Sequence, residues 1–139
     1  MELRDEHVRT VVKPSFPPVN NPEFLIEAAL HNPIASPGLA EIIKNRRPKM
    51  VVIVVNDHTR PTPYNYILPP LLKSLTKAGV EPNEIIFLVA TGAHRGNTGH
   101  EHIESLGAAV QNYRIVNHDC RGKLAFMGVL SNKILAVYA

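Results

Sequence analysis

The side chains best suited to chemistry lie in a short polar segment that directly follows an apolar run. Residues 51–55 (VVIVV) are apolar, and residues 56–63 (NDHTRPTP) come at once after them. Arg60 offers a fixed fork of donors that suits a carboxylate or a phosphate, and it keeps its charge at any working pH. Asp57 can orient Arg60 or accept a hydrogen bond from a ligand hydroxyl. A surface ion pair between Asp57 and Arg60, with no ligand, is the alternative that this pattern leaves open.

A second polar segment repeats the arrangement further along the chain. Residues 85–90 (IIFLVA) lead straight into residues 91–95 (TGAHR). Thr91 and Gly92 let the backbone approach a ligand closely. His94 can take or give a proton near neutral pH. A solvated loop histidine without a function is the alternative reading of this segment.

Neighbouring strands of a parallel sheet would position both segments. A continuous β-branched run is typical of a strand that is buried on both faces, and ligands bind beyond the carboxyl ends of such strands. A third apolar run, residues 113–116, ends just before His118. Because parallel strands put their carboxyl ends together, we expect Asp57, Arg60, His94 and His118 at one edge of the sheet.

Helix signals alternate with these strands. Asn21-Pro22, Ser36-Pro37 and Thr62-Pro63 are typical helix starts, and Thr98 with Glu101 has the spacing of a capping box. Pro69 and Pro70 predict a kink or a break in the third helix. The other expected elements are short strands at residues 8–12, 124–129 and 134–138. The sequence thus predicts one α/β domain over residues 1–139, a Rossmann-like layered fold whose mostly parallel sheet is flanked by helices and ends within the fold at the C-terminus.

Composition excludes several classes of protein. No apolar run approaches the ~20 residues of a membrane span, and the charged N-terminus has no signal-peptide core. The single cysteine, Cys120, excludes an internal disulfide framework and favours the cytoplasm. A net charge of +3 with scattered basic residues gives no basis for nucleic-acid binding. No metal site is predicted, because the adjacent side chains of residues 117–120 point to opposite faces and His100 and His102 are expected at the surface.

The chain resembles the N-terminal part of the nickel-dependent lactate racemase family. The matching segments, in the family's order, are AALHNPI (28–34), VVNDHTRPTP (54–63), ILPPLL (67–72), VATGAHR (89–95) and RIVNHD (114–119). The resemblance implies a domain that holds a nickel-pincer nucleotide and racemises a 2-hydroxy acid by moving hydride to the cofactor and back.

The same resemblance assigns roles to residues. It implies that His94 is the general acid/base on the substrate hydroxyl and that Arg60 helps to hold the substrate. Asp57, Thr91 and Gly92 are expected near the cofactor or the substrate. The family's anchoring lysine, its nickel-ligating histidine and its second acid/base histidine lie beyond residue 139.

Two functions are therefore expected. The first is an N-terminal fragment of a lactate racemase-like 2-hydroxy acid racemase or epimerase with half of the active site, which alone neither retains nickel nor racemises lactate. The second is a non-catalytic module for anion or nucleotide binding or for oligomerisation. We also expect a homo-oligomer formed through the C-terminal strands, whose exposed apolar residues would be Leu130, Ile134, Leu135, Val137 and Tyr138.

Overall fold

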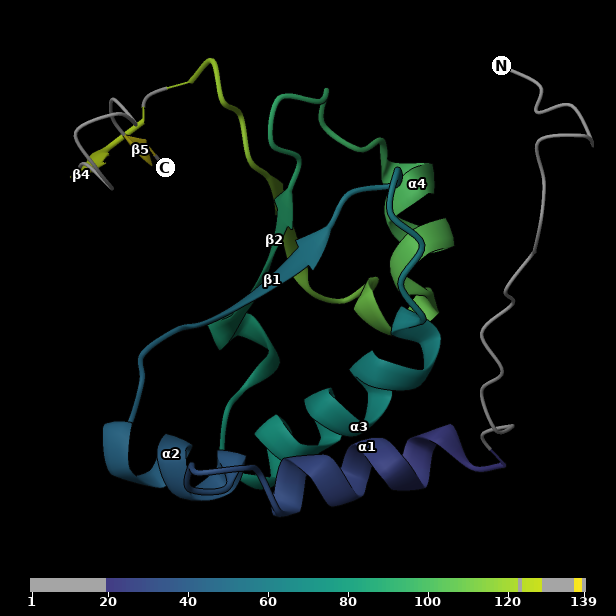
Figure 1. Cartoon of the computed structure of the whole chain (residues 1–139), viewed down its shortest axis with the longest axis vertical. Helices are drawn as coiled ribbons and strands as arrows, with labels where there is room; N and C mark the ends of the chain where they lie inside the picture. The colour runs from purple at the N-terminus through teal and green to yellow at the C-terminus, as the bar shows by residue number, and fades with distance from the viewer. Residues whose placement is uncertain (1–19, 123, 129–136, 139) are drawn as a thin grey trace, which may run out of the picture.

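The computed structural model describes residues 20–122, 124–128 and 137–138. The strand predicted at residues 8–12 and most of the one predicted at residues 134–138 lie outside the described residues. The elements in chain order (Figure 1) are α1 (Pro22–His31), α2 (Leu39–Arg46), β1 (Val51–Asn56), α3 (Tyr64–Lys77), η2 (Pro82–Glu84), β2 (Ile85–Ala90), α4 (Gly99–Leu106), η3 (Ala108–Val110), β3 (Arg114–Asn117), β4 (Phe126–Gly128) and β5 (Val137–Tyr138).

The main sheet has three parallel strands in the order β1-β2-β3. Val55 is level with Val89, and Val89 is level with Asn117, so all three strands end at the same edge. β4 and β5 form a separate antiparallel pair. The predicted α/β fold with a mostly parallel sheet is therefore confirmed.

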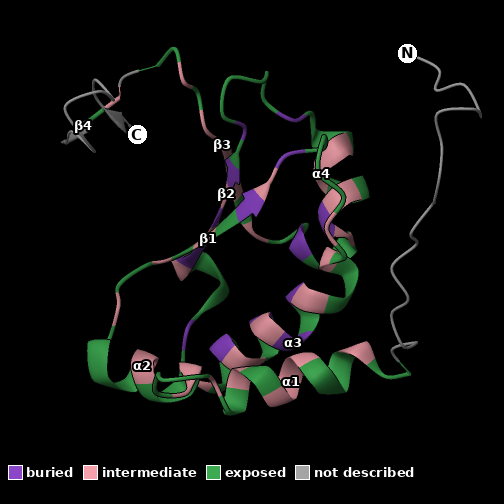
Figure 2. Cartoon of the chain, in the orientation of Figure 1, coloured by how far each residue is buried: buried purple, intermediate pink, exposed green. Residues whose placement is uncertain are grey.

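One face of the sheet carries the core (Figure 2). Alternate residues of the strands meet the apolar sides of α3, α4 and η3, while α1 and α2 pack against α3. The buried apolar residues are Val55, Leu68, Leu72, Leu75, Val80, Ile85, Phe87, Val89, Leu106 and Val110. This packing fixes the strands, and with them the loops that follow their carboxyl ends.

The other face of β1 corrects a sequence prediction. Residues 51–55 were expected to be buried on both faces, yet Val52 is 49% exposed and Val54 is 63% exposed. The described helices pack on one face only, so no described residue buries these two side chains. A β-branched run predicts a strand because it fits a pleated surface, whether or not both faces are covered.

Two of the four predicted helix starts, Asn21-Pro22 and Thr98, are confirmed, whereas Thr62 makes no cap and α3 begins one residue later than predicted, at Tyr64 after Pro63. The Asn21 side chain accepts from the Phe24 N–H at 3.0 Å, and Thr98 and Glu101 form the predicted capping box. The second helix differs: it begins at Leu39 after Gly38, and no side chain caps it. The prediction that Ser36-Pro37 begins the helix is therefore wrong by two residues.

α3 continues through both of its prolines. Pro69 and Pro70 lie inside one helix of 14 residues, so the predicted break does not occur. Each proline removes one N–H from the helix, which leaves the carbonyls of Asn65 and Tyr66 without their usual donors. Both of these residues are exposed, so water can satisfy those oxygens. Among the described helices, none has the length and apolar character needed to cross a membrane.

Arg47 provides a test of the backbone at the end of α2. It has φ 43° and ψ 56°, a left-handed conformation that L-residues other than glycine adopt at a cost. We expect Arg47→Gly to raise the free energy of unfolding by ~1 kcal/mol, measured by urea denaturation. Arg46→Gly, inside the last helical turn, should lower it instead.

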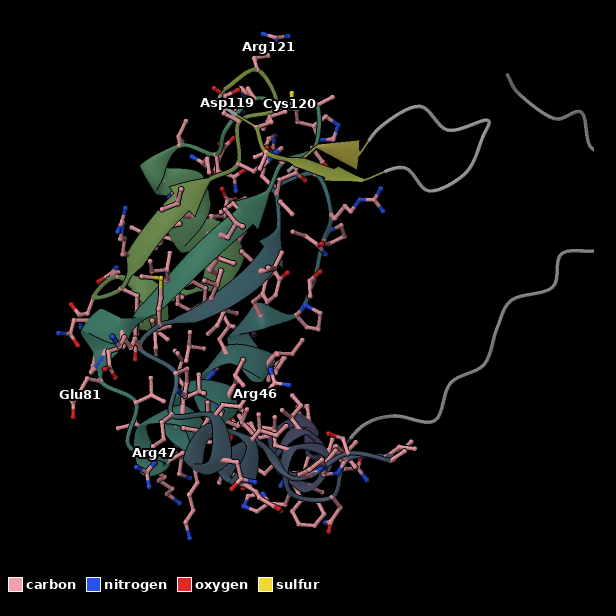
Figure 3. The ribbon with its side chains drawn as sticks, turned by 90° about the vertical axis from the view of Figure 1, so that its left-hand side faces the viewer. Arg46, Arg47, Glu81, Asp119, Cys120 and Arg121 are labelled. Atoms are coloured by element: carbon pink, nitrogen blue, oxygen red, sulfur yellow. The ribbon has the colours of Figure 1, made fainter. Side chains whose placement is uncertain are left out.

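The position of Arg47 separates this stability measurement from any effect on the carboxyl edge of the sheet. Arg46 and Arg47 lie at the end of the molecule opposite to Asp119, Cys120 and Arg121 (Figure 3). The change therefore leaves the carboxyl edge of the sheet untouched. A loss of stability in Arg47→Gly, or a gain in Arg46→Gly, would contradict the argument from backbone strain.

Candidate active site at the carboxyl edge of the sheet

The predicted site segments meet at one edge of the sheet. Asp57 follows β1, and Thr91 follows β2. His118 follows β3, and its N–H donates to the Val89 carbonyl at 2.9 Å. The Thr91 hydroxyl donates to the His118 carbonyl at 2.6 Å. The prediction that the three strand ends share one edge is confirmed.

Asp57 and His94 form the central contact of this edge. His94 Nδ1 lies 2.5 Å from Asp57 Oδ2, and the two residues are 37 positions apart in the chain. The Asp57 side chain is only 3% exposed, whereas that of His94 is 56% exposed. Because a carboxylate can only accept, His94 Nδ1–H is the donor. The Nε2 atom of neutral His94 is then an acceptor, free to take a proton.

The partner of Asp57 differs from one that the sequence suggested. Asp57 and Arg60 form no ion pair; only their backbones meet, with the Arg60 N–H donating to the Asp57 carbonyl at 3.2 Å. Three side-chain and backbone groups bind the carboxylate instead: the Thr59 hydroxyl at 2.6 Å, the Thr59 N–H at 3.2 Å and His94. The alternative of a surface Asp57–Arg60 pair is therefore wrong.

These donors keep Asp57 ionised. The hydrogen bond from the Thr59 hydroxyl, followed by that from His94, lowers the pKa of Asp57 from 3.8 to about 2, although burial acts in the opposite direction. A carboxylate that stays charged near neutral pH holds the His94 ring in one orientation by accepting from its Nδ1–H.

The lowered pKa of Asp57 predicts a contribution to acid stability. Between pH 3.8 and pH 2 the unfolded chain binds a proton at this position and the folded chain does not. The contribution is therefore complete above pH 3.8 and is lost as the pH falls towards 2. We expect Asp57→Asn to unfold with a shallower pH dependence over this range than the parent, as measured by urea denaturation at several pH values. Glu41→Gln, at an exposed position, is the control, and identical slopes in the parent and Asp57→Asn would contradict the prediction.

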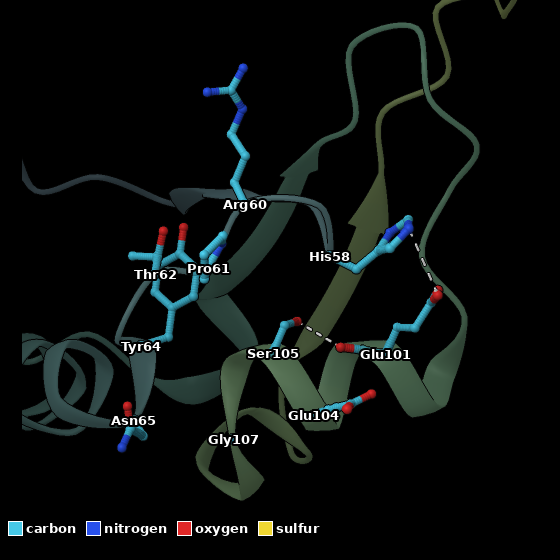
Figure 4. A pocket seen from close by; sticks show the side chains of 10 residues that line it. All are labelled: His58, Arg60, Pro61, Thr62, Tyr64, Asn65, Glu101, Glu104, Ser105 and Gly107. Atoms are coloured by element: carbon cyan, nitrogen blue, oxygen red, sulfur yellow. Dashed lines mark hydrogen bonds and ion pairs between the residues drawn. The ribbon is translucent and has the colours of Figure 1, made fainter. Parts of the chain in front are cut away.

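Arg60 borders a different hollow from His94. A cavity of about 430 Å³ lies between the loop after β1 and α4, lined by His58, Arg60, Tyr64 and Glu101 among others (Figure 4). The Arg60 side chain extends away from the other labelled side chains of this cavity, and it makes no hydrogen bond or ion pair with any described residue. His94 lines a second cavity of about 340 Å³. The two predicted catalytic residues thus share the sheet edge but not one pocket.

Arg95, the other arginine of these loops, is already engaged. Its guanidinium donates to both carboxylate oxygens of Glu101, at 2.8 and 2.7 Å. This pair, with a further hydrogen bond from the Thr98 N–H, holds the pKa of Glu101 well below its usual range. Arg95 therefore joins the loop after β2 to α4. Arg60 is the better candidate for the residue that binds an anionic ligand.

Sequence reasoning missed a polar network beside the pair. His102 was expected at the surface, but it is half-buried and its Nε2 lies 3.1 Å from Asn117 Oδ1. Its position four residues before the buried Leu106, on the same helix face, was the available signal. Asn97 is 6% exposed, and no sequence pattern marks it as buried. The described residues contain no group of three or more His, Cys, Asp or Glu side chains that could hold a metal ion.

Comparison with known proteins identifies the family. The profile of a family described as the lactate racemase N-terminal domain matches residues 1–137. The chain belongs to this family. The suspected resemblance is confirmed, and the match covers the segments that carry Asp57 and His94.

Two curated lactate racemases are similar to the chain. The protein from Thermoanaerobacterium thermosaccharolyticum is 34% identical over 124 residues, which are 86% of this chain and 28% of that protein. The one from Lactiplantibacillus plantarum is 39% identical over 94 residues, 67% of this chain and 22% of that protein. This lactate racemase N-terminal domain therefore spans less than a third of the length of these relatives.

A solved structure supports the same assignment. The lactate racemase apoprotein from T. thermosaccharolyticum superposes with a TM-score of 0.79 at 30% identity, covering 99% of this chain and 32% of that one. A Thermotoga maritima protein superposes with a TM-score of 0.58 at 24% identity, which supports the fold alone.

Proposed function

We propose that this chain is the N-terminal part of a 2-hydroxy acid racemase or epimerase and that it supplies an acid/base group and an anion-binding group to the active site. The observation that carries the proposal is the contact between His94 Nδ1 and the buried carboxylate of Asp57. An exposed imidazole on a buried, ionised carboxylate is the arrangement in which histidine works best as a general base.

His94 moves the proton in this proposal. Its Nε2 accepts the proton of the substrate hydroxyl as the carbon centre is oxidised and returns it when the opposite face is reduced. Asp57 stabilises the imidazolium between these two events, because its carboxylate stays ionised across the neutral range. Asp57 thus acts through His94, as an orienting group beside the substrate.

Arg60 holds the substrate carboxylate in this proposal, for which its side chain must turn from the hollow that it borders towards that of His94. Its guanidinium has no partner among the described residues and can bind two carboxylate oxygens at once. The Thr91 hydroxyl is engaged by His118, so we propose that Thr91 shapes the turn and that the Gly92 backbone approaches the cofactor or substrate. Gly92 has φ 57°, the left-handed region that glycine adopts without strain.

The nickel-pincer nucleotide implied by the resemblance would accept and return the hydride when bound. Because the described residues offer no group that could hold a metal, we propose that the nickel ligands lie outside them. From the resemblance, Asp57 and the Thr91-Gly92 turn are the residues of this chain that would contact the cofactor. We place the chain in the cytoplasm, in keeping with its single cysteine.

A chimera tests the proposal. Residues 1–137 of this chain replace the matching segment of the T. thermosaccharolyticum lactate racemase, in a host that makes the pincer cofactor. We expect the chimera to interconvert D- and L-lactate or a related 2-hydroxy acid, while the chain by itself neither retains nickel nor racemises. An inactive but folded and cofactor-loaded chimera would contradict the proposal.

A non-catalytic module is the second candidate. The observation that favours it is the separation of Arg60 and His94 into two hollows, since a binding module needs the arginine but not the histidine. In that case the chain would bind a carboxylate or phosphate ligand, Arg60→Ala would abolish binding, and His94→Gln would leave it unchanged.

We also propose that the chain forms a homo-oligomer through its C-terminal apolar residues. Residues 129–136 and 139 lie outside the described residues, so the basis of this proposal is the sequence alone. Light scattering at micromolar concentration should give a mass above that of one chain, falling to one chain when residues 130–139 are deleted. A single-chain mass before the deletion would contradict it.

A further inference from the structure

Two asparagines join the three strand-end segments of this edge. Asn117, the last residue of β3, places both atoms of its side-chain amide on the backbone of Asn97. Its Oδ1 accepts from the Asn97 N–H at 3.1 Å, and its Nδ2 donates to the Asn97 carbonyl at 2.9 Å. A planar amide bound at two points fixes both the distance and the orientation of the segment that it holds.

Asn97 in turn contacts the segment after β1. Its side-chain Oδ1 accepts from the backbone N–H of His58 at 3.3 Å and from the His58 ring Nδ1 at 3.0 Å. A backbone N–H can only donate, so the atom that faces it must be the amide oxygen. The side chain of Asn97 is buried, and its Nδ2 has no partner among the described residues. The chain of contacts therefore runs from β3 through the loop after β2 to the loop after β1.

The lock, defined as Asn97 and Asn117 with these contacts, holds the chain just after each member of the Asp57–His94 pair. Asp57 immediately precedes His58, and His94 lies three residues before Asn97. The lock thus restrains both segments whose side chains must meet. His102 adds a further restraint, because its Nε2–H donates to the same Asn117 oxygen that faces the Asn97 N–H.

Gly96 gives an independent sign that the lock is tight. A Cβ atom at this position would lie 3.0 Å from Asn117 Nδ2, 3.1 Å from its Cγ and 3.2 Å from its Cβ. These separations are closer than carbon atoms normally approach, so alanine at 96 would push the Asn117 amide away. Gly99, three residues later, has nothing within 4 Å of its added Cβ.

We propose that Asn117 is a positioning residue for the acid/base pair: its amide sets the backbone at Asn97, and through it the loop that brings His94 onto Asp57. The consequence of this positioning for catalysis rests on the proposed function, whereas the positioning of the loop does not. Asn117 acts without touching substrate. Its loss should therefore alter the state of the His94 ring, and not only the stability of the fold.

The test reads the His94 ring directly. Two-bond ¹H–¹⁵N NMR correlations distinguish the Nδ1–H tautomer from the Nε2–H tautomer, and Asp57→Asn defines the spectrum of a ring without its carboxylate. We expect Asn117→Ala and Gly96→Ala to lose the Nδ1–H preference, by about tenfold in the tautomer ratio, and to move towards Asp57→Asn. Gly99→Ala, the matched control, should keep the parent spectrum.

Asn117→Asp keeps the test decisive if the alanine variant does not fold. Its carboxylate retains both accepted hydrogen bonds but turns an oxygen towards the Asn97 carbonyl in place of the donor, so we expect a tautomer ratio shifted towards that of Asp57→Asn. A lowered melting temperature with a parent-like His94 spectrum, in Asn117→Asp and Gly96→Ala alike, would overturn the proposal and leave Asn117 a stability residue. The measurement needs no turnover, so an inactive chimera would count against the proposed function and not against the lock.

Discussion

His94→Gln in the chimera should slow racemisation by ~10²–10⁴-fold, the usual contribution of a general acid/base. Glutamine has a similar length to histidine, but it cannot carry a proton at neutral pH. The effect should fall mainly on kcat, because in the proposed mechanism Arg60, and not the imidazole, holds the substrate. The initial rates of D-to-L and L-to-D conversion measure it.

Two variants make this result interpretable. His100→Gln is the matched control: its side chain is 88% exposed on α4 and lies outside the proposed machinery, so the parent rate should persist. Arg60→Lys should instead raise KM, since lysine keeps the charge but loses the two-point contact. A His94→Gln enzyme within threefold of the parent would remove His94 from the mechanism.

Phe87→Ala should lower the free energy of unfolding by ~3–5 kcal/mol, the range found for large-to-small changes in tightly packed cores. Phe87 is 0% exposed at the centre of the middle strand, level with Ile53 on one side and Ile115 on the other. Its ring also meets that of Tyr113 edge to face, with the centroids 5.7 Å apart. Urea denaturation followed by circular dichroism measures the loss.

Val54→Ala is the control for Phe87→Ala. Val54 lies on the neighbouring strand but on the open face, where it is 63% exposed, so its truncation should cost less than ~1 kcal/mol. Comparable losses of stability in the two variants would mean that the open face of the sheet, which carries Val54, is covered in solution. The difference between the two losses of stability therefore tests whether the core covers only one face of the sheet.

The location of the candidate site could be predicted from sequence because it depends on local pattern. Each apolar run ends abruptly before a polar segment, and parallel strands gather those ends at one edge. The identity of the contacts could not be predicted in the same way. Whether Asp57 meets Arg60 or His94 depends on how the loop after β2 turns at Thr91, and the hydrogen bond of Thr91 to His118 joins residues 27 positions apart.

The helix boundaries also divide into those that short-range sequence spacing predicts and those that it does not. Asn21 and Thr98 cap through side chains that bond within three residues, so short-range spacing was sufficient. α2 has no such bond, so short-range spacing gives no signal for its start after Gly38. The continuity of α3 through Pro69 and Pro70 likewise depends on a buried apolar stripe that outweighs the lost backbone donors.

The order of the strands has a consequence for how the polypeptide is made. Every hydrogen-bonded pair of the main sheet joins strands that are consecutive in the chain, β1 with β2 and β2 with β3. Each pairing spans one crossover, residues 57–84 or 91–113, so the sheet needs no segment beyond β3 in order to form. Domains form N-terminal first during synthesis. In relatives about three times as long, the matching sheet should therefore be assembled while the ribosome is still translating the rest of the enzyme.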